Sequence, residues 1–194
     1  RPATIYPRPN TRPPYSLYYY NGPSSEMTNA GGLDYAANAG VRIVTTLMGN
    51  WKQQPGATTP VWDGGGITHA GATVTIAEIA DGTTSTYMLG EKFINPDYYF
   101  TGQDGTDDHG MYEGHGPDVM RWCNYNPAAN QVFAPLQDVP AGDYRWHFGS
   151  AHSGSLNMAF CDGSIHSISY AIAPAVHAML GERADGHTVD AKLY

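Results

Sequence analysis

An acidic loop holds the residues whose types and spacing best suit metal chemistry. Within residues 101–108 the carboxylates of Asp104, Asp107 and Asp108 follow one another closely, and glycines stand beside them. Carboxylate oxygens are the ligands that Ca²⁺ prefers, and glycine allows the tight turning that a short loop around a cation requires. The spacing is not that of an EF-hand. The plain interpretation is a solvated acidic loop, and the alternative that these ligands suggest is a Ca²⁺ site.

The eight histidines form no comparable pattern. The sequence contains no H-E-x-x-H motif and no Cys/His finger spacing, so a zinc site has weak support. It also lacks a G-x-S-x-G elbow, a recognisable Cys–His nucleophile pair and a phosphate-binding loop. We therefore expect a protein that is not an enzyme. We expect His152 to be structural, with its ring hydrogen-bonded to the backbone near a turn at Asp162–Gly163.

The two cysteines, Cys123 and Cys161, could form one disulfide. A surface rich in Tyr, Asn, Gly and Thr suits an extracellular protein, in which such a bond would persist. The alternative is a pair of buried free thiols, because the sequence does not show whether the two Cα atoms lie close enough.

The composition excludes several classes of protein. The chain has 194 residues, a formal net charge of −8, only 14% charged residues, and 23 Gly, 14 Pro and 14 Tyr. A coiled coil needs Ala, Leu, Glu and Lys instead, and a nucleic-acid partner needs a basic face. No apolar stretch is long enough to span a bilayer. With 41% hydrophobic residues, the chain can bury a core, so disorder is not expected.

Six of the 14 prolines lie in residues 1–23. Proline fixes φ and removes a backbone donor, so this arm should run extended over a surface. Its tyrosines indicate that it docks on its own domain or on a neighbouring copy, because so much aromatic surface is seldom left in water. We assign self-association to Tyr15, Tyr18, Tyr19 and Tyr20, and a single head domain to residues 24–194.

Short elements are expected along the head. The sequence predicts strands over residues 41–47 and 83–94, and a long irregular stretch over 95–147. Thr75 and Glu78 have the spacing of a capping box, which predicts a short helix there. The clearest signal is a hairpin over 155–170 with a two-residue type I′ turn at Asp162–Gly163.

A last helix should begin at Pro174 and end with Gly181 in the C′ position. Taken together, these elements predict an α+β, sheet-rich fold with antiparallel strands, long loops and a few short helices.

Two blocks of sequence resemble the DUF1559 family, a large group of secreted proteins abundant in Planctomycetes. The block 79–92, IADGTTSTYMLGEK, is similar to that family's "ITDGTSNT…GEK" signature, and the nine residues between His152 and Asp162 reproduce its H-x9-DG motif. Segments near residues 34–40 and 181–186 also resemble the family. The motif residues are Asp81, Gly82, Glu91, His152, Asp162 and Gly163.

The resemblance implies a pseudopilin-like protein. Family members typically carry a type IV pilin-like N-terminal helix followed by a mainly β globular head, and they look like proteins that assemble into filaments. The pilin-like helix does not appear in this sequence, and this puts assembly through a helical core in doubt. Pseudopilin heads also use Ca²⁺ in loops, which agrees with the acidic loop described above.

We therefore expect a secreted or cell-surface structural protein that associates with copies of itself. Low charge and abundant Tyr, Asn and Gly give an adaptable contact surface with little like-charge repulsion. One alternative is a monomeric module that binds glycans or peptides; another is a metal-dependent hydrolase. The binding module would stack its ligand on tryptophans, of which the chain has Trp51, Trp62, Trp122 and Trp146.

Overall fold

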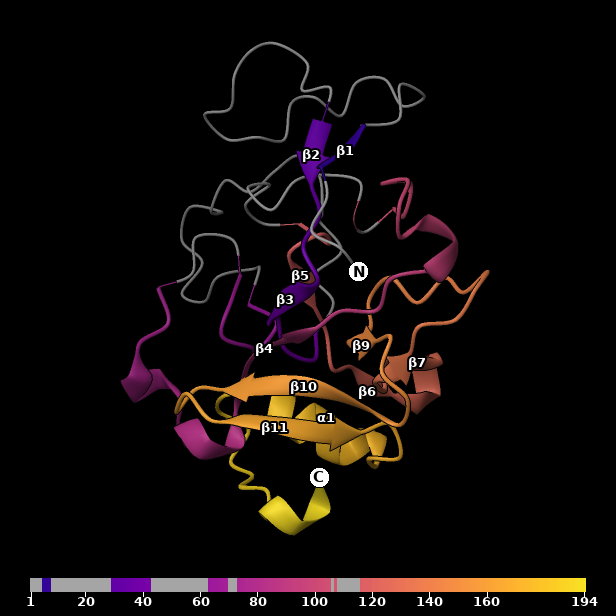
Figure 1. Ribbon diagram of the computed structural model, residues 1–194. Helices are drawn as coiled ribbons and strands as arrows, with labels where there is room; N and C mark the ends of the chain where they lie inside the picture. The colour runs from indigo at the N-terminus through magenta and orange to yellow at the C-terminus, as the bar shows by residue number, and fades with distance from the viewer. Residues whose placement is uncertain (1–4, 8–28, 43–62, 70–72, 106, 108–115) are drawn as a thin grey trace.

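The computed structural model describes residues 5–7, 29–42, 63–69, 73–105, 107 and 116–194. A five-stranded sheet organises this part of the chain, in the order β11-β10-β4-β3-β5 (Figure 1). All neighbours in it are antiparallel except β3 and β5. Its strands are β3 (Tyr35–Asn38), β4 (Tyr87–Glu91), β5 (Met120–Arg121), β10 (Ser155–Phe160) and β11 (Ile165–Ser169). The expected α+β, sheet-rich class is therefore confirmed.

Three two-stranded pairs accompany the sheet. The strand β1 pairs with β2, β6 with β7, and β8 with β9, the last pair being parallel. Their bounds are β1 (Ile5–Pro7), β2 (Asn29–Gly31), β6 (Tyr125–Asn126), β7 (Gln131–Val132), β8 (Leu136–Gln137) and β9 (Gly149–Ser150). Because β1 lies in the proline-rich arm, one part of that arm pairs with its own chain; Tyr15, Tyr18, Tyr19 and Tyr20 lie outside the described residues.

The predicted hairpin is present as β10 and β11, and buried and less buried side chains alternate along β10. Leu156, Met158 and Phe160 are fully buried, and Ser155 lies opposite Ser169 in the register. The predicted turn type is wrong. Four residues join the strands, and Gly163 (φ +88°) has a positive φ whereas Asp162 does not. A type I′ turn requires positive φ at both central residues, so this connection is a longer one closed by glycine.

The single α-helix of the described chain, α1 (Pro174–Gly181), begins at proline as predicted. Gly181 is its last helical residue and not a C′ residue, since Glu182 follows with φ −91°. The glycine is needed for close packing instead. A Cβ built on Gly181 would lie 2.6 Å from the Cβ of Cys123, a distance that real Cβ atoms do not reach.

The other predicted elements are partly confirmed. The capping box is present, with the Thr75 N–H donating to Glu78 Oε2 at 2.7 Å, and it caps a 3₁₀ turn, Ile76–Glu78. The strand expected over 83–94 is shorter, because Thr83–Ser85 forms another 3₁₀ turn before β4 begins. Residues 41 and 42 are not in a strand, and the rest of the 41–47 prediction lies outside the described residues.

The remaining 3₁₀ turns lie in or after the long irregular stretch. Their bounds are Pro96–Tyr98, Pro127–Ala129 and Ala191–Leu193. Apart from these turns, the described part of 95–147 holds only the short strands β5 to β8. The prediction of a long irregular stretch is therefore confirmed for the part that the structure describes.

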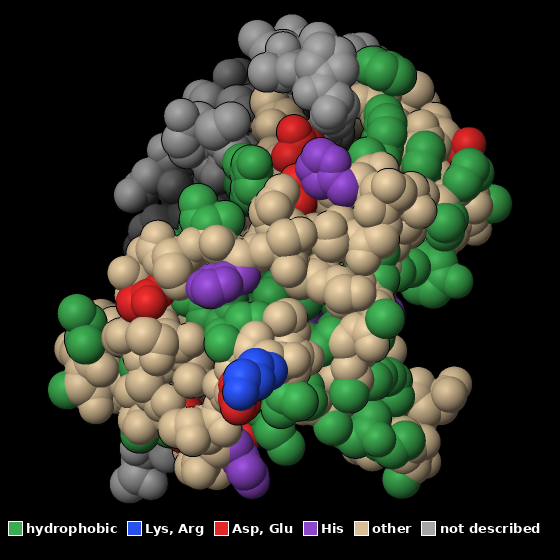
Figure 2. Space-filling view, turned by 60° about the horizontal axis from the view of Figure 1, so that its bottom comes forward, with side chains coloured by type: hydrophobic (Ala, Val, Ile, Leu, Met, Phe, Trp, Pro, Cys, Tyr) green, Lys and Arg blue, Asp and Glu red, His purple; other side chains and the backbone are tan. Residues whose placement is uncertain are grey.

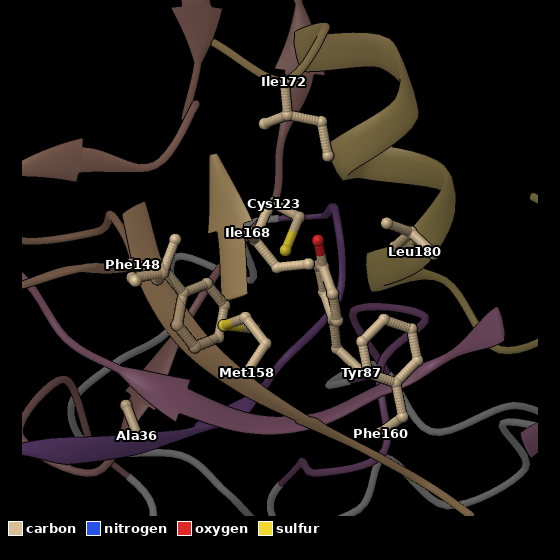
Figure 3. Close-up of a cluster of buried hydrophobic side chains, with 10 residues drawn as sticks. Ala36, Tyr87, Cys123, Phe148, Met158, Phe160, Ile168, Ile172 and Leu180 are labelled. Atoms are coloured by element: carbon tan, nitrogen blue, oxygen red, sulfur yellow. The ribbon is translucent and has the colours of Figure 1, made fainter. Parts of the chain in front are cut away.

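The main core lies between one face of the sheet and α1 (Figure 3). Tyr87 and Phe160 meet there edge to face, with ring centroids 5.1 Å apart. Ile168, Ile172 and Leu180 close the cluster from β11, the following turn and the helix. A second, smaller cluster contains Ala39, Met120 and Trp122. No helix in the described ranges is both long and apolar enough to cross a membrane.

Candidate functional site

The two motif blocks meet at Glu91, the last residue of β4. Its Oε1 lies 3.2 Å from His152 Nε2, and its Oε2 accepts a hydrogen bond from the Asn157 N–H at 2.6 Å. The carboxylate of the Gly-Glu-Lys block therefore contacts both the histidine of the H-x9-DG motif and the strand that follows it. The His152 side chain is 61% exposed, so this pair lies at the surface.

The predicted contact of His152 with the Asp162–Gly163 turn is wrong. All six residues of β10 lie between them, so they stand at opposite ends of the hairpin. The tyrosine that follows β11, Tyr170, holds the His152 end instead: its hydroxyl lies 3.1 Å from the carbonyl oxygens of both Ser150 and His152. The spacing of the H-x9-DG motif is therefore set by the length of β10 and of the turns on either side of it.

Asp81 and Gly82 connect the first motif block to the C-terminal segment. The Asp81 carboxylate accepts hydrogen bonds from the N–H groups of Asp185 (2.7 Å) and Gly186 (2.8 Å), and Asp81 is only 4% exposed. Gly82 has φ +96°, which a residue with a Cβ rarely adopts. The Asp-Gly pair therefore makes a turn and fastens the segment after α1.

Two further polar residues, not identified from the sequence, hold distant segments together. The buried Asn38 amide donates to the carbonyl oxygens of Tyr87 and Gly181, both at 2.9 Å. Arg183 forms a two-pronged ion pair with Asp63, which lowers the pKa of Asp63 to about 2, chiefly through the hydrogen bond itself. Only their position within the family-like segments, at 34–40 and 181–186, pointed to them in the sequence.

Glycines allow the backbone to approach closely beside Asn38. Gly40 has φ +89°, and a Cβ there would lie 2.2 Å from the carbonyl oxygen of Gly64. The Gly64–Gly66 run therefore packs directly against the chain that follows β3.

A buried cluster of charges lies where β4 ends. Lys92 Nζ donates to Asp107 Oδ1 at 2.9 Å and to the Asp118 carbonyl at 2.7 Å. Arg121 is fully buried and donates to several backbone carbonyls, including His147 at 3.0 Å and Phe93 at 3.2 Å. Burial lowers the pKa of Lys92 and brings the pKa of Arg121 to about 10. Asp104, also buried, accepts from the Asn95 N–H.

Two of the three carboxylates suggested for a Ca²⁺ site belong to this cluster, and the Ca²⁺ site stays a prediction. The Asp107 carboxylate is engaged by the Lys92 ammonium and the Leu33 N–H, and Asp104 by a backbone amide. One of the suggested cation ligands, Asp107, is therefore in contact with a lysine. Asp108 lies outside the described residues. Within the described chain, no three His, Cys, Asp or Glu side chains group so as to hold a metal ion.

Of the two alternatives for the cysteines, a disulfide or two free thiols, the structure has the free thiols. Cys123 and Cys161 are both free thiols, the first buried and the second partly so. Burial raises the pKa of Cys123 well above its usual range and that of Cys161 to about 11. Thiols held protonated in this way are poor nucleophiles. Cys123 lies against Gly181 of α1, whereas Cys161 directly follows β10.

One of the four tryptophans, Trp122, and one histidine, His177, are buried in the core. Trp122 is 2% exposed and packs edge to face on Trp146, with ring centroids 5.3 Å apart; Trp51 and Trp62 lie outside the described residues. His177 is fully buried, and burial lowers its pKa to about 3, so it stays neutral. Its Nδ1 lies 3.3 Å from the Tyr87 hydroxyl.

The contacts of the described motif residues show that these residues hold the fold together. Each makes a turn or connects segments far apart in the chain, and among them only Glu91 and His152 present an ionisable pair to solvent. No curated protein and no solved structure matches the chain. A family model described as "Protein of unknown function (DUF1559)" matches residues 5–175. Since this match covers most of the sequence, the chain belongs to the DUF1559 family.

Proposed function

We propose that this protein is a non-enzymatic, extracellular structural protein that assembles with copies of itself through the free edge of its main sheet. The observation that carries the proposal is the character of β11. This strand is the last in the sheet, and β10 is its one neighbour among the described strands (Figure 1). A strand edge exposes unpaired N–H and C=O groups, which can pair with another chain.

The edge lacks the usual protection against such pairing. Natural edge strands often carry Lys or other charges, prolines or bulges. The sequence of β11 is Ile-His-Ser-Ile-Ser, with no Lys, Arg, Asp, Glu or Pro, and its pairing with β10 is regular over five residues. Ile165 is 73% exposed, which adds apolar area at the start of the edge.

The same strand of a second copy is the partner that fits best. Two β11 strands placed antiparallel about Ser167 would set each Ser167 opposite its counterpart and Ile165 opposite Ser169. No two acidic or basic side chains meet in this register, because the one ionisable side chain of the strand, His166, lies opposite Ile168. The pairing is isologous, because the same patch serves both copies.

The surface chemistry supports association more generally. One face of the molecule shows few charged side chains, scattered among hydrophobic and uncharged polar ones (Figure 2). Several large apolar side chains are exposed on the described chain, and aromatic rings of this kind are enriched at interfaces. They include Tyr35, Ile76, Phe100, Tyr125, Tyr144 and Leu193.

A filament needs a second contact, because an isologous interface closes a dimer. We assign that contact to the arm, residues 1–23, as its tyrosines indicate. On this proposal, deleting the arm leaves dimers joined through β11, whereas the intact chain forms larger assemblies.

A charge-swap experiment tests the β11 contact. Ser167→Lys and Ser167→Glu each place like charges opposite one another, so each purified variant should lose the β11 contact. An equimolar mixture should regain it, because the opposed charges then attract. Size-exclusion chromatography with light scattering, on chains without residues 1–23, gives the oligomeric state directly.

The matched control is Gln103→Lys, which makes the same change in net charge at an exposed loop position. It should leave the dimer intact. A wild-type protein that remains monomeric at all concentrations would overturn the proposal, and so would Ser167 variants that associate as wild type does. The binding-module alternative requires two exposed tryptophans along one groove, and the burial of Trp122 does not favour it.

A further inference from the structure

The contact between Lys92 and Asp107 is unusual for its burial. The side chains are 0% and 2% exposed, and the Lys92 Nζ lies 2.9 Å from Asp107 Oδ1. The Asp118 carbonyl, 2.7 Å from the same nitrogen, fixes the direction of the amine. The Leu33 N–H donates to Asp107 Oδ1 at 3.3 Å and helps to hold the carboxyl group in place. An amine and a carboxyl group are therefore kept in contact away from bulk water.

Burial favours the uncharged form of the Lys92 amine. It lowers the pKa of Lys92, and the nearby Arg121 guanidinium acts in the same direction, although Asp107 and Asp118 oppose them. Moving a proton from the ammonium to the carboxylate across the hydrogen bond leaves a neutral amine beside a neutral carboxylic acid. A neutral amine is a nucleophile, and holding it against its target replaces a bimolecular encounter with a unimolecular step.

We propose that Lys92 and Asp107 condense spontaneously to form an intramolecular amide bond. The lone pair of Nζ attacks Cγ of Asp107 and forms the N–C bond. The tetrahedral intermediate then loses one carboxyl oxygen as water, which carries away the proton delivered from the ammonium and one more from the nitrogen. No oxidant, reductant or other reactant is required. The product is neutral, so both buried charges disappear from the interior, together with the cost of keeping them there.

Asp118 is the group placed to move the second proton. Its side chain is buried beside the pair, at 2% exposure, and its charge acts on Lys92. As a carboxylate it can take a proton from the attacking nitrogen and pass it to the departing oxygen, as a general base and then a general acid. Its backbone carbonyl orients the amine in either case.

The bond would covalently join the main sheet to the long irregular stretch. Lys92 directly follows β4, and Asp107 lies 15 residues further along the chain. A crosslink here restricts the unfolded chain as a disulfide does, in a protein whose two cysteines are not bonded to each other. This inference does not rest on the proposed self-association.

Intact-protein mass spectrometry of the purified, denatured and reduced chain tests the proposal. The mass should be one water molecule below that of the sequence. Trypsin should fail to cleave after Lys92, so residues 53–121 should be recovered as one linked product lacking one water. Lys92→Met should abolish the loss of water, whereas Lys192→Met, a lysine near the C-terminus, should leave it unchanged.

Succinimide formation at an Asp-Gly pair also releases water, and the chain contains several such pairs. Hydroxylamine opens a succinimide but not the proposed amide, so the loss of mass should survive that treatment. A wild-type chain of full mass that trypsin cleaves normally after Lys92 overturns the proposal. A loss of water that persists in Lys92→Met, or that hydroxylamine reverses, overturns it as well.

The role of Asp118 has its own test. Asp118→Asn keeps the backbone carbonyl and the size of the side chain but cannot relay a proton. The appearance of the crosslinked mass after synthesis should slow by about 100-fold or more. Crosslinking at the wild-type rate in this variant would remove Asp118 from the reaction while leaving the Lys92–Asp107 bond intact.

Discussion

Two buried clusters, one apolar and one charged, lie near the beginning and the end of strand β4. On one side, Tyr87 belongs to an apolar cluster that also contains Leu156, Phe160 and Leu180. At the end of the same strand, Lys92 enters a cluster of buried charges with Asp107 and Arg121. The first cluster is closed by one hairpin and one helix, whereas the second is assembled from the long irregular stretch. The difference shows that this small sheet holds its loops with buried polar contacts as well as with buried apolar side chains such as Phe93 and Met120.

The largest expected effect comes from removing a charge from the polar interior. Arg121→Met should lower the free energy of unfolding by about 3–5 kcal/mol, because it leaves buried carboxylates without their counter-charge. Arg121→Lys should not restore it, since an ammonium cannot reach the carbonyls of His147 and Phe93 together. Chemical denaturation followed by tryptophan fluorescence measures both. Arg145→Met, at an exposed ion pair, is the control and should cost less than about 1 kcal/mol.

Shortening a side chain of the apolar cluster should lower the free energy of unfolding by a somewhat smaller amount. Leu156→Ala removes a fully buried side chain from β10 and should destabilise the protein by about 3 kcal/mol through lost burial and the cavity left behind. Ile165→Ala, on the exposed edge of the same hairpin, should change stability by less than about 0.5 kcal/mol. Equal losses in the two variants would contradict the assignment of the hairpin faces.

The apolar cluster should also make the stability of the protein depend on pH, because His177 is buried in contact with it. Burial lowers its pKa from 6.5 to about 3, so the unfolded chain binds a proton between these values that the folded chain does not. Stability should therefore fall as pH decreases below about 6.5, by up to about 1.4 kcal/mol per pH unit. His177→Phe should flatten the profile between pH 3 and 6.5. A profile equally steep with and without His177 would assign the acid sensitivity to carboxylates instead.

The smallest effect is expected at the surface pair that joins the two motif blocks. His152→Ala should reduce stability by about 1 kcal/mol or less, because the ring is well exposed and its ion pair with Glu91 is screened by water. Thermal unfolding in low and high salt measures how much the ion pair contributes to stability. A loss comparable to that of Arg121→Met would show that His152 has a role beyond this contact.

Patterns of local origin predicted the elements well. Alternation in β10, proline at the start of α1 and the Thr75–Glu78 box each act within a few residues, so the sequence displays them directly. The positions of polar side chains were harder to predict. The sequence places the His152 contact at the wrong end of its hairpin, and it does not show that Lys92 binds Asp107. Such contacts join residues far apart in the chain, and no local rule identifies which of several acids meets which base.

What the sequence alone determined is therefore the class and family of the protein: a loop-rich, weakly charged, α+β chain with the DUF1559 motifs. Only the tertiary structure decided what those motifs do. It placed Asp81 on the backbone after α1, Glu91 on His152, and Lys92 in a dry contact with Asp107. The physical reason is that hydrophobic patterning and turn preferences are properties of neighbouring residues, whereas the pairing of a buried charge depends on which segments the completed fold brings together.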